Sequence, residues 1–83
     1  MRREEKLKKI RNELQDFEKC LNEARGDVEA AFDRWLESWR LLGVVETIMC
    51  WVDMGWTEEK VRRELQEMFQ FIDEELAKIK AEG

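Results

Sequence analysis

The amino-acid sequence predicts an all-α protein, an antiparallel up-down-up three-helix bundle that forms a single domain over residues 1–83. Charged residues make up 42% of the chain and proline is absent, which is typical of long helices. Apolar residues recur every three or four positions, and no run alternates as a half-buried strand would. Short connections make neighbouring helices antiparallel, so the first and third helices should run in the same direction.

A narrow apolar seam predicts the first helix over residues 2–24. The Arg25-Gly26-Asp27 triplet then predicts a helix end, at which Gly26 takes a left-handed conformation and Asp27 caps the next helix. The seam residues are spaced by three or four positions: Leu7, Ile10, Leu14, Phe17, Leu21 and Ala24.

The second helix is predicted to begin at Val28, and the last helix to cover residues 58–81 with Thr57 as its N-cap. The expected inner face of the second helix is Val28, Ala31, Phe32, Trp35, Trp39 and Leu42. The expected inner face of the last helix is Val61, Leu65, Met68, Phe69, Ile72, Leu76 and Ile79.

The segment from residue 41 to 56 has more apolar residues than one helix face can bury. If the second helix continues to Met54, its heptad gives core positions to Leu42, Val45, Met49 and Val52. A second stripe of Leu41, Val44, Ile48 and Trp51 then lies on another flank, where it would form an exposed apolar patch.

Three explanations of this second stripe stay open. A break at Gly43 could separate a short helix that turns the stripe into the core. Alternatively, a continuous helix could use the stripe to bind another copy of the chain, or to bind a different protein in a groove. Phe71 is expected near the level of Leu41. The candidate partner-binding residues are therefore Leu41, Val44, Ile48, Trp51 and Phe71.

Composition excludes several kinds of chemistry. Histidine is absent and the two cysteines, Cys20 and Cys50, lie far apart in sequence, so neither a histidine-based triad nor a tetrahedral zinc site is expected. The glycines are isolated and form no phosphate-binding loop. Carboxylates are expected on solvated helix faces. We predict no catalytic residues, no metal and no cofactor.

The charge distribution argues against general nucleic-acid binding, which depends on cations that neutralise phosphates. The net charge is −5, although residues 1–12 hold six basic and two acidic side chains. No segment resembles a signal peptide or an apolar membrane span of about 20 residues. We therefore expect no membrane association and a soluble protein of a reducing compartment such as the cytoplasm, or a recombinant one if it is engineered.

The segment "MGWTEEKVRREL" (residues 54–65) resembles the corner of a bacterial helix–turn–helix regulator. This resemblance implies a small dimeric DNA-binding regulator, which is the alternative function. The segment departs from the family pattern at Trp51, where a small residue is usual, and its second helix carries as many acids as bases. The matching residues are Met54, Gly55, Trp56, Thr57, Val61 and Leu65.

The short connections, the helix faces rich in Glu, Lys and Arg, and the lack of proline and histidine resemble de novo designed or engineered helical bundles. The cysteines, Gly43 and four tryptophans are unusual in an idealised design. They fit a selected binder built on a bundle, or a small thermophile or viral protein. The predicted function is a non-enzymatic protein-interaction or assembly module that presents an apolar helical surface to a protein partner or a second copy.

Overall fold

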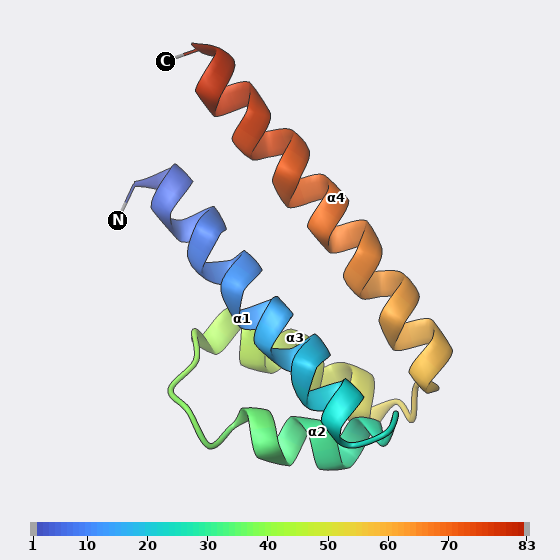
Figure 1. Cartoon of the computed structure of the whole chain (residues 1–83). Helices are drawn as coiled ribbons and strands as arrows, with labels where there is room; N and C mark the ends of the chain where they lie inside the picture. Colours follow the sequence, from blue (N-terminus) through green and yellow to red (C-terminus); the bar gives the residue numbers. More distant parts are fainter. Residues whose placement is uncertain (1, 83) are drawn as a thin grey trace.

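The computed structural model describes residues 2–82, which form four helices and no strand. The helices are α1 (Arg3–Glu23), α2 (Val28–Trp35), α3 (Leu42–Asp53) and α4 (Glu58–Glu82). Helices α1 and α4 lie side by side, and the start of α1 and the end of α4 lie at the same end of the molecule (Figure 1). The short helices α2 and α3 pack against the other end of this pair, and α1 contacts all three other helices.

The all-α prediction is confirmed, but the prediction of three helices is wrong. The segment expected to form one second helix is two helices, which adds a reversal of the chain. As a result α1 and α4 run antiparallel, where the up-down-up bundle made its first and last helices parallel. Contacts between α1 and α4 show the direction: Arg11 pairs with Asp73, Glu18 with Gln66, and Asn22 with Arg62.

The second helix ends at Trp35, because side chains anchor the loop of residues 36–41 to α1. The Trp35 indole Nε1 donates to the backbone carbonyl of Glu13 at 2.8 Å. Arg40 Nε donates to the carbonyl of Trp35 at 3.0 Å, its Nη1 donates to Asp16 at 2.8 Å, and its guanidinium lies 4.9 Å from the centre of the Trp35 ring. We call Glu13, Trp35 and Arg40 the loop anchor.

Glu13 also caps the start of α3. Its Oε1 accepts a hydrogen bond from the backbone N–H of Leu41 at 2.9 Å, although the two residues are 28 positions apart. Its Oε2 is buried, and no hydrogen-bond partner for it lies among the described residues. The positive end of the α3 dipole offsets part of the free-energy cost of burying this carboxylate. The cap of α3 therefore comes from another helix.

The possible break at Gly43 occurs earlier in the chain, over residues 36–41. Gly43 lies in the first turn of α3, and a Cβ added to it would meet no atom within 4 Å. Neither a turn nor a close helix contact therefore requires this glycine. The expected ends of the other helices are confirmed within two residues.

The predicted turn residues have the expected conformations. Gly26 has a φ of 86°, and Asp27 accepts a hydrogen bond from the N–H of Ala30. Thr57 Oγ1 accepts one from the N–H of Lys60 at the start of α4. These caps satisfy amides that a helix leaves unpaired at its first turn.

The core lies where all four helices meet. Its central side chains come from the predicted seams of the first, second and last helices: Leu14, Phe17, Leu21, Ala31, Phe32, Trp35, Val61, Leu65, Phe69 and Ile72. Three positions that the sequence assigned to inner faces, Trp39, Leu42 and Met49, are exposed instead. Trp39 lies in the anchored loop, and α3 is rotated so that Val44, Ile48 and Trp51 enter the core.

Replacing Arg40 with alanine should destabilise the protein by about 1–3 kcal/mol. The variant loses a cationic donor to a helix carbonyl and a contact with an aromatic face, at a side chain that is only 9% exposed. Chemical denaturation of Arg34→Ala is the matched control, because Arg34 makes an exposed pair with Glu23 that contributes roughly 0–1 kcal/mol. Equal losses in the two variants would contradict a special role for the loop anchor.

Candidate functional site

The structure separates the five predicted partner-binding residues. Val44, Ile48 and Trp51 belong to the core, with exposed fractions of 7% or less. The continuous helix with an exposed stripe is therefore wrong, and the alternative of a separate short helix that turns its stripe inward describes the structure. Leu41 is half-buried, and Phe71 is 58% exposed.

An apolar groove lies at the start of α3, against α1 and α4. Its volume is about 360 Å³. Two of the predicted residues, Leu41 and Val44, line it. We call it the corner groove, and its lining is completed by Lys6, Ile10, Leu42, Gly43, Thr47 and Met68.

The α2–α3 layer covers only one end of the pair of long helices (Figure 1), and residues at the start of α3 line the corner groove. Beyond it, α1 and α4 continue toward the chain ends. Apolar side chains there are only half-buried, whereas seam residues beneath the layer, such as Leu14 and Leu65, are fully buried. We call this outer part of α1 and α4 the arm. Its half-buried apolar residues are Leu7, Ile10, Leu76 and Ile79.

Phe71 extends the apolar surface beside the corner groove. It follows Met68 by three positions on α4, which places the two side chains on the same flank of the helix. Leu42, on the α3 side, is 71% exposed. Sequence reasoning missed Leu42 as a surface residue because a continuous helix placed it in the core seam.

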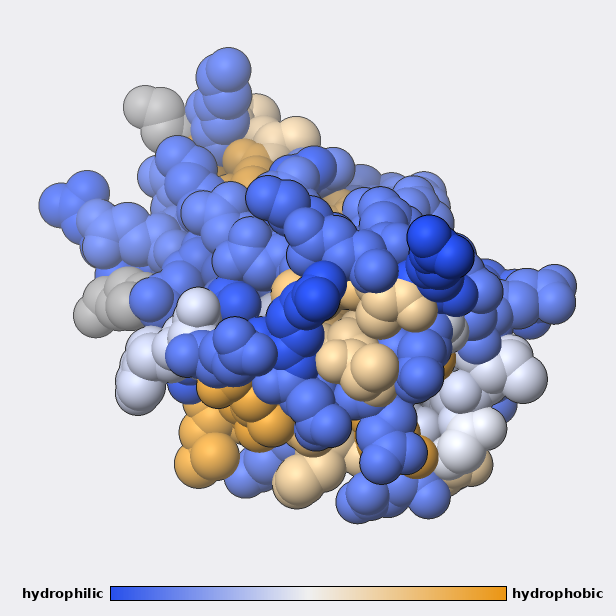
Figure 2. Space-filling model, turned by 60° about the horizontal axis from the view of Figure 1, so that its bottom comes forward, coloured by the Kyte–Doolittle hydropathy of each residue, from blue (hydrophilic) through white to orange (hydrophobic). Residues whose placement is uncertain are grey.

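Other apolar side chains reach the surface at the end of the molecule formed by α2 and α3. Leu36 and Met49 are each 41% exposed, and Met54 is 63% exposed. Figure 2, which brings this end forward, shows apolar patches interrupted by hydrophilic side chains. None of these three side chains lines the corner groove.

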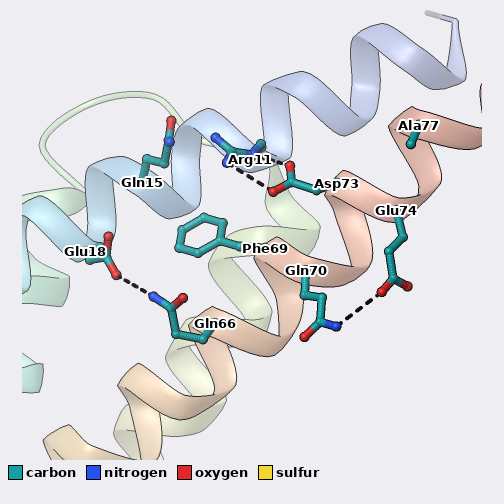
Figure 3. Close-up of a pocket in the computed structure, with 9 residues that line it drawn as sticks. All are labelled: Arg11, Gln15, Glu18, Gln66, Phe69, Gln70, Asp73, Glu74 and Ala77. Atoms are coloured by element: carbon teal, nitrogen blue, oxygen red, sulfur yellow. Dashed lines mark hydrogen bonds and ion pairs between the residues drawn. The ribbon is translucent and has the colours of Figure 1, made fainter. Parts of the chain in front are cut away.

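A second, polar groove of about 670 Å³ runs between α1 and α4 (Figure 3). Its polar side chains are largely paired with one another. Arg11 donates to both oxygens of Asp73, at 2.7 and 3.3 Å, and its guanidinium lies 5.5 Å from the centre of the Phe69 ring. Gln66 donates to Glu18, and Gln70 donates to Glu74. These pairs cross-link the two helices or stay within α4.

The chemistry of the polar groove is that of a charged surface. The hydrogen bond from Arg11 lowers the pKa of Asp73, so this carboxyl is ionised at neutral pH. A general acid would need the opposite shift. Partial burial and the nearby Glu23 raise the pKa of the Cys20 thiol, which disfavours the reactive thiolate.

Within residues 2–82, no group of three or more Cys, Asp or Glu side chains is placed to hold a metal ion. None of the four described helices combines the length and the apolarity that crossing a membrane requires.

No protein-family model matches the chain, and neither the curated proteins nor the solved structures contain a match.

Replacing Asp73 with asparagine should remove stability in a pH-dependent way. Because the pKa of Asp73 is lowered in the folded protein, its ionised form stabilises the fold above the unfolded-state pKa of about 4. This contribution is lost as the pH falls through the lowered folded-state pKa. Urea denaturation should show wild type more stable than Asp73→Asn at pH 7, with the difference shrinking below pH ~4.

Glu67→Gln is the control, because it removes one exposed negative charge from the same helix and leaves the Arg11–Asp73 pair in place. A difference between wild type and Asp73→Asn that stays constant down to pH ~2 would contradict the ion pair as its source.

Proposed function

We propose that the protein is a non-enzymatic interaction module that binds the apolar face of a helix from another protein in the corner groove. The observation that carries this proposal is the arrangement of apolar side chains from three helices around one open groove, with Leu42 and Phe71 largely in solvent beside it. Apolar helix faces dock in such grooves through side chains spaced three and four positions apart.

The size and lining of the groove favour a protein partner over a small cofactor. A volume of about 360 Å³ is near the lower end of ligand sites, roughly 300–1,000 Å³. The charged and polar lining groups are Lys6 and Thr47, too few to orient a polar ligand. Continuity with the half-buried side chains of the arm provides a longer apolar track, which suits a helix. A selected binder built on a helical bundle would have such a surface.

DNA binding through residues 54–65 is the alternative function, and no observation favours it. Arg62 donates to Glu58 and Arg63 lies 3.5 Å from Glu59, each one turn earlier on α4. Arg62 also donates to Asn22 on α1. The carboxylates beside these arginines oppose phosphate contacts.

A displayed library of amphipathic helical peptides tests the proposed function. Peptides selected on the wild-type protein should bind the Leu42→Asp variant more weakly. The new Asp carboxylate would have to lose its water against the apolar side chains of the peptide. We expect a loss of tenfold or more, which corresponds to about 1.4 kcal/mol. Binding is measured by surface plasmon resonance on immobilised protein.

Met54→Asp is the matched control: Met54 is 63% exposed, against 71% for Leu42, but does not line the groove. Thermal melts should show both variants folded, since both residues are exposed. A library that yields no binders, or binders equally sensitive to both variants, would refute the groove as a protein-binding surface.

A further inference from the structure

The rim of the corner groove is positively charged on its α1 side. Lys6 and Lys9 lie three positions apart on α1, which puts them on one face of the helix, and Arg2 is the N-cap residue one turn before Lys6. Lys6 lines the groove itself. Lys9 lies 5.3 Å from the ring centre of Trp39, a side chain that is 76% exposed. A basic stripe therefore borders the apolar surface.

Most other cations of this region are paired, but Lys6 is not. Arg3 pairs with Glu75, Lys8 with Glu4, and Arg11 with Asp73. Among the described residues, Lys6 has no carboxylate within ion-pair distance. Its ammonium group is thus available to a partner at the groove.

On the α3 side of the groove, a carboxylate already caps the helix dipole. The first turn of α3, which includes Leu42 and Gly43 of the lining, contains no acidic residue. The amides of this turn form the positive end of the helix dipole. Glu13 caps the turn from α1 through Leu41. The buried carboxylate of Glu13 offsets this positive end, so the positive potential at the groove is that of Lys6 and Lys9 on the α1 side.

A second copy of the chain fits this groove poorly. In an isologous dimer centred on the groove, the same patch meets itself across a two-fold axis. The Lys6 side chains of the two copies would then lie close together, and like charges that approach across an interface oppose association.

From this charge pattern, and resting on the proposed function, we infer that the partner is an acidic amphipathic helix. Its apolar face packs on the corner groove and the arm, between Leu42 and Phe71. Its acidic side chains line the edge that faces Lys6 and Lys9. Charge complementarity at the rim then selects the partner and its orientation, while apolar burial supplies most of the affinity.

Two synthetic peptides test this inference. Both carry the same apolar face, taken from a clone selected on the groove, and one has glutamates where the other has lysines along one flank. Fluorescence anisotropy on the full chain should show the acidic peptide binding about tenfold more tightly in low salt, because a few exposed ion pairs each add a small attraction. The preference should weaken in 0.5 M salt because exposed charges are screened.

The charge-reversal variant Lys6→Glu should weaken binding of the acidic peptide about three- to tenfold. Lys8→Glu is the control, since it makes the same change on the same helix but two positions away, on a face where Lys8 pairs with Glu4. Equal effects of the two variants would show a response to net charge only, and would overturn the inference.

The outcomes separate the inference from the proposed function. If the two peptides bind equally and Leu42→Asp abolishes both, the groove binds helices without selecting acidic ones, and the inference alone fails. If neither peptide binds, the proposed function fails as well. Sedimentation equilibrium that shows a dimer dissociated by Leu42→Asp would assign the groove to a second copy and overturn the acidic partner.

Discussion

The anchoring of residues 36–41 to α1 determines how the rest of this chain folds. The Trp35 indole, the Arg40 guanidinium and the Glu13 carboxylate connect the end of α2 and the start of α3 to one turn of α1. Because the loop is fixed there, the chain reverses once more than a three-helix bundle would. Helix α4 then returns antiparallel to α1, and their charged flanks meet as cross-helix pairs.

The same anchor explains why a groove exists. One long second helix would cover the full length of α1 and α4, whereas the folded-back pair α2 and α3 covers only part of it. Where the cover stops, side chains such as Ile10 and Met68 form an apolar groove instead of a closed core. The basic start of α1 lies beside this opening, so the position of the loop anchor gives the surface both its shape and its charge.

The sequence predicted the helical class, the turn at Gly26, the caps at Asp27 and Thr57, and most of the core, since these depend on local chemistry and the helical period. It could not predict the loop anchor, because Glu13 and Leu41 are 28 positions apart. In addition, the helical pattern alone places Glu13 on a solvated helix face. Because the loop anchor was missed, the rotation of α3 was missed as well. Ile48 and Trp51 were therefore expected outside the core, and Leu42 inside it. Of the predicted partner-binding residues, Leu41 and Val44 line the corner groove.

The most direct test of this account is the distance between spin labels at positions 5 and 78, in a Cys20→Ser/Cys50→Ser background, by double electron–electron resonance. Arg11 is level with Asp73 and Glu18 with Gln66, which puts Glu5 level with the end of α4 that carries Lys78. With helix axes roughly 8–10 Å apart, we expect a label distance of about 20–25 Å. In an up-down-up bundle the two labelled positions would be offset along the helix axes by about 27 Å, at a rise of 1.5 Å per residue. The lateral separation of the helices adds to this offset. A label distance above ~30 Å would therefore contradict the antiparallel pairing and with it the corner groove.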